Sequence, residues 1–264
     1  MTPAVDRIDL VQTTSLSQET IDINMDGFDF DTAPAEFQKV RWVVETPFII
    51  SGVGWTMNYC FTIRKAYQDR MSGVSLIALS NNLAWEIAFA LINLPPNPFP
   101  RAIFPLWLSI NAFVLYATLK FERESGSHSP FMRRHLPSIV LISVLGLLSG
   151  HLAFSSHVGP LAALYWGGML CQVTLSASAL GLLLQRGHTR GMSYKMWLTR
   201  FVASGVTVPG LFVRAAYWPA KWHWVDNVLM YWLVGAFYCL DITYGVCLWY
   251  FRRVERRSTR VKQG

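Results

Sequence analysis

Seven apolar stretches constrain this chain more than any other feature, because each approaches the roughly 20 residues that a helix needs to cross a bilayer. They run over 42–63, 74–93, 102–120, 136–156, 160–184, 197–217 and 228–250. The first, second and sixth carry polar or ionisable residues and are weaker by hydropathy. Charged residues make up only 15% of the chain, against about 25% in soluble domains. The pattern predicts an all-α polytopic membrane protein, a seven-transmembrane-helix bundle.

The basic residues predict an orientation. Of the 23 lysines and arginines, 17 lie in 64–70, 120–134, 186–200 and 252–262, which alternate with the remaining loops. Positive loops stay cytosolic, so the N-terminus is predicted to be outside (lumenal) and the C-terminus cytosolic. This alternation requires an odd number of spans. It also explains the net charge of +7 without nucleic acid as a partner.

The chain divides into three regions. Residues 1–40 are polar, rich in acids and without the apolar core of a signal peptide, and we expect them to be partly disordered. Residues 41–251 form the transmembrane domain, and 252–264 form a basic cytosolic tail. The four cysteines all fall inside predicted spans, and none pair at metal-ligand spacing. We therefore expect them to be packing residues and expect no metal site.

Two acids lie deep in predicted spans, where an ionisable group is costly and is a functional candidate by default. Glu86 lies about 18 Å and Asp241 about 14 Å from the cytosolic ends of their spans, at about 1.5 Å per residue. They would face each other near the midplane if the second and seventh spans are neighbours. The alternative is that the two buried acids serve folding alone.

The residues around these acids share their helix faces. Asn82 lies one turn before Glu86, and Phe89 extends the same face. Tyr238 and Tyr244 flank Asp241 at spacings of three, so two phenols are predicted beside it. A carboxyl buried in apolar surroundings tends to stay protonated and is then a Brønsted acid.

Other polar groups in the spans have simpler expected roles. His151 is expected to be a satisfied core histidine. Arg200 and Arg214 end a stripe on the sixth span, and we expect both to reach the interfaces by snorkelling. Asn58, Asn111 and Gln172 are candidates for hydrogen bonds between helices.

Missing motifs exclude several functions. The chain has no Asp-Asp pair for a diphosphate–magnesium site, and no His-Glu-x-x-His, GxGxxG or P-loop pattern. The seventh span has no lysine for a retinal Schiff base, and no Pro-Gln motif of seven-helix exporters occurs.

Several motifs occur together in a characteristic order. They are Met25-Asp26-Gly27-Phe28-Asp29, Asp69-Arg70, Asn82-Leu83-Ala84-Trp85-Glu86, Gly150-His151-Leu152-Ala153, the loop from Arg186 to Tyr194, Trp197-Leu198-Thr199-Arg200-Phe201, Arg214 with Tyr217-Trp218-Pro219, and Asp241-Ile242-Thr243-Tyr244-Gly245. Through them the chain resembles the fungal integral-membrane terpene cyclases of meroterpenoid and indole-diterpene pathways, from about residue 25 to 253. It departs from the family in the 24 residues before Met25 and in Ser80-Asn81-Asn82 before Leu83-Ala84-Trp85-Glu86.

The resemblance implies a chemistry. The family protonates a terminal epoxide, or in some members an alkene, on a prenyl chain, and cyclisation through carbocations follows. Its two essential acids correspond to Glu86 and Asp241, and no metal or other cofactor is implied. The candidate substrate-binding and orienting residues are Asn82, Trp85, Phe89, Trp55, Asn58, His151, Trp166, Tyr238, Tyr244 and Arg214.

We therefore expect a metal-independent, multi-pass membrane cyclase of the endoplasmic reticulum that acts on a lipophilic prenylated aromatic or polyketide substrate. Two alternatives remain open: an indole-diterpene cyclase of the same family, and a proton-coupled small-molecule transporter that uses the same acids as a relay. The sequence leaves open which acid donates the proton, and whether the two acids share one.

Overall fold

The structure is a computed structural model that describes residues 25–124 and 129–263, where the chain forms helices joined by turns and no strand. The long helices are α2 (Trp42–Asp69), α3 (Leu76–Ile87), α4 (Pro98–Glu124), α5 (Pro130–Val158), α6 (Pro160–Arg186), α7 (Tyr194–Gly205), α8 (Thr207–Tyr217) and α10 (Val228–Gln263). The short ones are η1 (Asp26–Phe28), η2 (Phe30–Thr32), α1 (Ala35–Val40), η3 (Ala88–Ile92), α9 (Pro219–Trp222) and η4 (His223–Val225). The predicted all-α class is confirmed for these residues.

Each predicted span coincides with helical structure, but not every helix meets the length and hydropathy needed to cross a membrane. Within the described part of the chain five segments do so: Pro98–Glu124, Pro130–Val158, Pro160–Arg186, Tyr194–Tyr217, which comprises α7 and α8, and Val228–Ser258. Leu76–Ile92 is apolar but shorter, and α2 is not among the five. The chain therefore has the helices of an integral membrane protein, whereas the count of seven spans stays a prediction.

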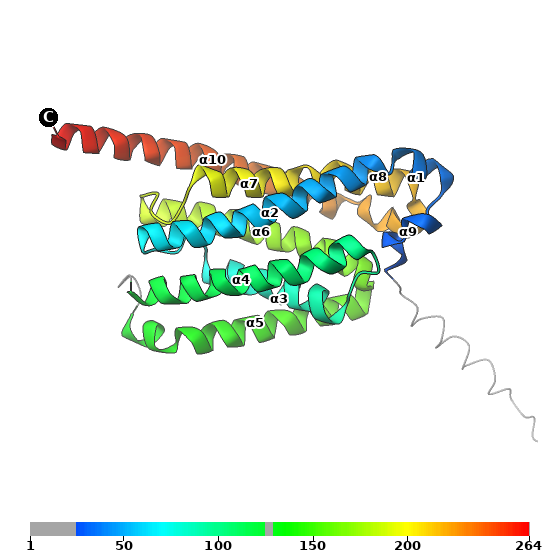
Figure 1. The fold of residues 1–264 in the computed structure, drawn as a ribbon, viewed down its shortest axis with the longest axis horizontal. Coiled ribbons are helices and arrows are strands. Elements are labelled where there is room, and N and C mark those ends of the chain that lie inside the picture. The colour runs from blue at the N-terminus through cyan, green and yellow to red at the C-terminus, as the bar shows by residue number, and fades with distance from the viewer. Residues whose placement is uncertain (1–24, 125–128, 264) are drawn as a thin grey trace, which may run out of the picture.

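The helices form one elongated bundle. Figure 1 shows the long helices along its long axis, with α10 continuing beyond the others at the C-terminal end. This continuation includes residues 252–263, where a separate tail was predicted, so the backbone has no break at residue 251. Helix α6 contacts both α3 and α10 and thereby connects the two helices that carry the deep acids.

Buried polar side chains explain why the weaker spans have low hydropathy. Helix α2 buries Asn58, Tyr59 and Thr62 but exposes Ile49 and Val53. Helix α3 likewise buries a polar set, which comprises Ser80, Asn81, Asn82 and Glu86. These helices direct polar groups inward and apolar groups outward, as a protein surrounded by lipid requires.

The N-terminal segment closes one end of the bundle. Phe28 and Phe30, from η1 and η2, are buried and belong to the main hydrophobic core together with Trp222 of α9. Figure 1 shows α1 and α9 at this same end. The predicted extension 1–40 is therefore partly structured, and its first 24 residues lie outside the described part.

At the other end of the bundle, polar contacts bind the loop after α6 to the ends of neighbouring helices. The Gly191 N–H donates to the Asp69 carboxylate at 2.6 Å, and Arg186 contacts Glu122 at 3.0 Å. The Thr189 hydroxyl donates to Glu255 at 2.7 Å. Two motifs in the resemblance, Asp69-Arg70 and the loop from Arg186 to Tyr194, therefore contribute to the structure at this end.

Candidate active site

Glu86 lies on the buried face of α3, with no exposed surface. Oε1 accepts hydrogen bonds from the Tyr59 hydroxyl at 2.6 Å and from Asn82 Nδ2 at 3.0 Å. Oε2 accepts one from Asn111 Nδ2 at 2.9 Å. These partners come from α2, α3 and α4, and all of them are neutral. The backbone leaves α-helical geometry directly after Ile87, where η3 forms a π-helical turn, a feature common at functional sites.

Asp241 is equally buried but has a cationic partner. Its carboxylate forms an ion pair with Arg200 of α7. The other oxygen accepts hydrogen bonds from Gln172 at 3.2 Å and Ser176 at 3.1 Å, both on α6. The Asp241 carbonyl accepts a 2.9 Å hydrogen bond from the Trp197 indole. The two acids therefore have different electrostatic surroundings.

Trp197 also explains the glycine of the Asp241-to-Gly245 motif. A Cβ at Gly245 would lie 2.4 Å from the Trp197 ring, closer than packed atoms allow. The absent side chain lets the indole approach α10 closely and donate to the Asp241 carbonyl. The Trp-Leu-Thr-Arg sequence thus places Trp197 on the Asp241 backbone and Arg200 on its side chain.

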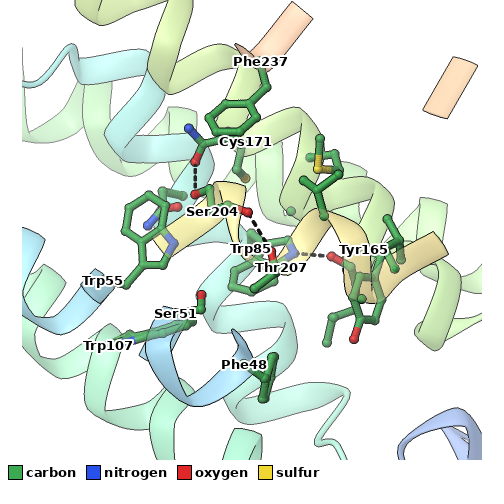
Figure 2. A pocket seen from close by; sticks show the side chains of 18 of the residues that line it. Phe48, Ser51, Trp55, Trp85, Trp107, Tyr165, Cys171, Ser204, Thr207 and Phe237 are labelled. Atoms are coloured by element: carbon green, nitrogen blue, oxygen red, sulfur yellow. Dashed lines mark hydrogen bonds between the residues drawn. The ribbon is translucent and has the colours of Figure 1, made fainter. Parts of the chain in front are cut away.

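A cavity of about 160 Å³ lies in the interior of the bundle. Most of its lining is aromatic or aliphatic, and Figure 2 shows Trp55, Trp85, Trp107 and Phe48 among the side chains around it. Its polar lining residues are Ser51, Tyr59, Asn82, Tyr165, Cys171, Gln172, Ser204, Thr207 and Arg214. An apolar space with a few placed polar groups is typical of a site for a lipophilic ligand.

The partners of both acids reach this cavity, although neither acid lines it. Tyr59 and Asn82, which hold Glu86, form part of its wall. Gln172, which holds Asp241, lines it too and accepts a 2.8 Å hydrogen bond from Ser204, visible in Figure 2. The cavity therefore lies between the hydrogen-bond networks of the two carboxyls.

A smaller cavity of about 50 Å³ adjoins it and shares Trp55, Tyr59 and Asn82. Its lining also includes Arg200 and Tyr244. The Arg200 guanidinium lies over the Tyr244 ring, 5.5 Å from its centroid.

The other predicted site residues are distributed differently. Asn58 borders the smaller cavity and donates to the Met196 carbonyl at 2.6 Å, and Trp85 donates to the Leu164 carbonyl at 2.9 Å. Four of the predicted substrate-binding residues line none of the cavities described here: Phe89, His151, Trp166 and Tyr238. Phe89 packs against Trp85, and His151 hydrogen-bonds Asn81 at 3.1 Å, as expected of a core histidine.

Tyr238 does not contact Asp241 in the way its spacing predicted. Its hydroxyl donates to the Gly205 carbonyl at 3.0 Å. Pro209, four residues after Gly205, has no N–H to donate to that carbonyl, and the helix is interrupted between α7 and α8 at Val206. Tyr238 therefore supplies the hydrogen bond that Pro209 cannot make.

We expect Tyr238→Phe to reduce the free energy of unfolding by about 0.5–1.5 kcal/mol, because it removes a hydrogen bond to a half-buried carbonyl. The added substitution Pro209→Ala restores an N–H at the correct position, so the double variant should be more stable than Tyr238→Phe alone. Denaturant unfolding in detergent micelles measures both. A double variant less stable than the single one contradicts this role.

The expected snorkelling of Arg200 and Arg214 is wrong. Arg200 is 8% exposed and paired with Asp241, and Arg214 is 4% exposed. The stripe therefore faces the interior, because α7 and α8 turn these side chains toward the cavity and its neighbours.

Sequence reasoning missed Tyr59 as a site residue. It lies next to Asn58 in the first predicted span, whose hydropathy is low. Two adjacent polar residues inside a span were the only sign in the sequence that Tyr59 has a role in the site. Among the described residues, 25–124 and 129–263, no cluster of three His, Cys, Asp or Glu side chains is placed to hold a metal ion. The expectation that no metal is needed stays a prediction.

Comparison with known proteins gives the family. Residues 28–254 match the family of Pyr4-like transmembrane terpene cyclases. A terpene cyclase of Penicillium shearii, esdpB, is 57% identical over 88% of this chain and 94% of its own length. Terpene cyclases of Aspergillus versicolor, cle7, and Penicillium canescens, olcD, are 52% and 40% identical, over 88% and 89% of this chain and 97% and 96% of their own lengths. No solved structure matches. The chain belongs to the Pyr4-like transmembrane terpene cyclases.

Proposed function

We propose that this enzyme cyclises the prenyl chain of a lipophilic prenylated aromatic or polyketide substrate in meroterpenoid biosynthesis. Acid from the protein opens a terminal epoxide, or protonates an alkene, and the chain then closes through carbocations without a metal. The observation that carries the proposal is Glu86, a fully buried carboxyl with neutral partners only, held beside an aromatic-lined cavity. An indole-diterpene substrate remains the alternative within the same family.

The partners of the two acids favour Glu86 as the proton donor. Glu86 has only neutral partners among the described residues, and burial without a cation disfavours a charged carboxyl, whereas Asp241 is paired with Arg200. Asn111 Oδ1 is buried without a partner. Rotating the Asn111 amide by 180° would bring this oxygen toward Oε2, where it would accept the proton of neutral Glu86. The site can therefore hold an undissociated acid.

Tyr59 connects this acid with the cavity. When Glu86 is protonated on Oε1, it can donate to the Tyr59 oxygen, which frees the Tyr59 O–H to turn toward the cavity. The phenol then gives its proton to the epoxide oxygen and receives one from Glu86. The carbon–oxygen bond breaks, and the electrons of the neighbouring alkene attack the cationic carbon. Tyr59 is thus proposed to be the group that contacts the substrate.

The walls of the cavity suit the carbocations that follow. Trp55, Trp85 and Trp107 line it, and attraction of a cation to the face of an aromatic ring contributes about 2 kcal/mol or more when water is excluded. Among the residues that the structure describes, no Asp or Glu side chain lines this cavity, so none of these carboxylates is placed there to capture the cation. Asp241 and its counter-ion Arg200 lie behind this wall, where Asp241 holds Gln172 of the cavity lining in place.

We expect Tyr59→Phe to lower kcat about 10- to 100-fold, because it breaks the proposed proton path and removes one hydrogen bond to Glu86. KM should change little, since the ring remains in the cavity wall. Steady-state kinetics with an epoxyfarnesylated aromatic acid measures kcat and KM separately. Tyr67→Phe is the matched control, because Tyr67 is 44% exposed. An unchanged kcat in Tyr59→Phe contradicts the relay.

The test of the function is expression of the chain in a host supplied with candidate epoxides, followed by identification of products by mass spectrometry. A cyclised product that depends on the chain supports the proposal, and the absence of any product from all prenylated epoxides contradicts it. Proton-coupled uptake into vesicles tests the transporter alternative, which the comparisons do not favour.

The seven-span topology, with a lumenal N-terminus in the endoplasmic reticulum, belongs to the same proposal. The distribution of basic residues supports it. A glycosylation acceptor added before Met25 should be modified, whereas one added after Lys262 should not.

A further inference from the structure

Arg214 is a buried cation without an acidic partner. It lies in the last turn of α8 and is 4% exposed. No carboxylate pairs with it in the described ranges 25–124 and 129–263, although the other buried arginine, Arg200, has Asp241. A buried charge without a counter-ion is costly, so the charge of Arg214 requires an explanation.

Four aromatic rings surround the Arg214 guanidinium. Its Cζ lies 4.6 Å from the ring centre of Trp222 and 5.3 Å from that of Tyr165. Phe28 and Phe30 lie at 5.8 and 5.7 Å. Cation–π attraction offsets part of the desolvation cost, but the rings provide no negative charge.

Hydrogen-bond donors of both Arg214 and Tyr165 lack an acceptor in the described part of the chain. Arg214 Nε is buried without a partner. Arg214 Nη1 donates to the Tyr165 hydroxyl, so the Tyr165 proton is free for another acceptor. Both residues line the aromatic-lined cavity of about 160 Å³, and Figure 2 shows the Tyr165 side chain at this cavity. A cationic donor next to a phenolic donor matches a ligand with two acidic oxygens, such as a carboxylate.

Arg214 lies far along the cavity from the Asp241 network. Ten residues separate it from Ser204, which is about 15 Å along the helices at 1.5 Å per residue. Arg214 also lines a third cavity, of about 220 Å³, beside Phe28 and Phe30. Glu45 borders that cavity too, but it is paired with Arg41 at 2.7 Å. A ligand bound at Arg214 by one end would extend its other end between the two acids.

We propose that Arg214 and Tyr165 bind an anionic head group, a carboxylate or an enolate, on the aromatic or polyketide part of the substrate. This inference rests on the proposed function and names the substrate class of the same cavity. Held at this end, the substrate directs the far end of its prenyl chain toward Tyr59 and Glu86. The head group also supplies the counter-ion that Arg214 lacks.

The test compares an epoxyfarnesylated aromatic acid with its methyl ester, using the full chain in lipid nanodiscs. The wild-type enzyme should prefer the acid about 10- to 100-fold in kcat/KM, the range expected for a hydrogen bond to a charged group. Arg214→Gln should abolish this preference while it still converts the ester, and Tyr165→Phe should reduce it. Arg101→Gln, a charge change at an exposed position that lines none of these cavities, should keep the preference.

A binding measurement without turnover distinguishes a failure of this inference from a failure of the proposed function. Dissociation constants are measured for the unreactive analogues, a farnesylated aromatic acid without the epoxide and its methyl ester. Tighter binding of the acid by the wild type, lost in Arg214→Gln, supports the anion site even if no epoxide is turned over. Equal binding of acid and ester, or a preference that survives both Arg214→Gln and Tyr165→Phe, overturns it. If Arg214→Gln does not fold, Tyr165→Phe decides the result.

Discussion

Replacing Glu86 with Gln should abolish cyclisation while the protein remains folded. Glutamine keeps the volume and can still hydrogen-bond Tyr59 and Asn111, but it has no acidic proton. General acids contribute about 10²- to 10⁴-fold to rates, and opening the epoxide starts every later step, so product formation should fall at least within this range. Mass spectrometry of products from an epoxyfarnesylated aromatic acid measures the loss.

The matched control for this substitution is Glu36→Gln. Glu36 is an exposed carboxyl on α1 whose ion pair with Lys39 has both side chains 68% exposed, so its loss should leave activity and folding unchanged. A Glu86→Gln variant with wild-type turnover would exclude Glu86 as the proton donor. A variant that no longer folds would show that the carboxyl has a structural role.

The positions of the helices were predictable because hydropathy is a local property. The predicted stretch 160–184 is nearly the observed α6, Pro160–Arg186, and the deep acids fall in helices as expected. Two features of the helices could not be predicted from local hydropathy. Residues 252–263 continue α10, and Gly205 and Pro209 interrupt the sixth stretch, which helical periodicity alone did not indicate.

The site was less predictable, because its geometry depends on which helices are neighbours. The predicted meeting of Glu86 and Asp241 required α3 to lie against α10. Instead, α3 packs mainly on α5 and α6, whereas α10 packs mainly on α6 and α7. Each acid therefore has its own partners, and no hydrogen bond joins them in the described part of the chain. A directly shared proton is not supported by this arrangement.

The two buried arginines show more clearly that sequence alone does not predict which helices are neighbours. Arg200 and Arg214 lie toward the ends of the sixth predicted span, where snorkelling is the usual expectation. The partner of Arg200 is 41 residues away in the sequence. The rings around Arg214 include Phe28 and Phe30, from a polar segment that hydropathy assigned to an extension. Contacts over such separations leave no periodic signal, so only the folded structure could show that both cations are buried.

The ion pair between Arg200 and Asp241 changes what Asp241→Asn should do. The sequence alone predicts a folded but inactive variant. The structure adds that this substitution leaves Arg200 buried without its counter-ion, and breaking a buried pair by removing one partner costs about 3–5 kcal/mol. We therefore expect Asp241→Asn to lose both cyclisation and a large part of its stability, measured as the free energy of unfolding in detergent.

A second substitution separates these two effects. Arg200→Gln in the Asp241→Asn background removes the unpaired charge, so the double variant should regain much of the lost stability, because a neutral pair can be hydrogen-bonded at the same place. If Asp241 also acts on the reaction through its charge, activity should stay low in the stable double variant. Stability that is unchanged in Asp241→Asn would contradict the buried ion pair. Wild-type turnover in the double variant would restrict Asp241 to a structural role, since charge at this position would then contribute nothing to the carbocation chemistry.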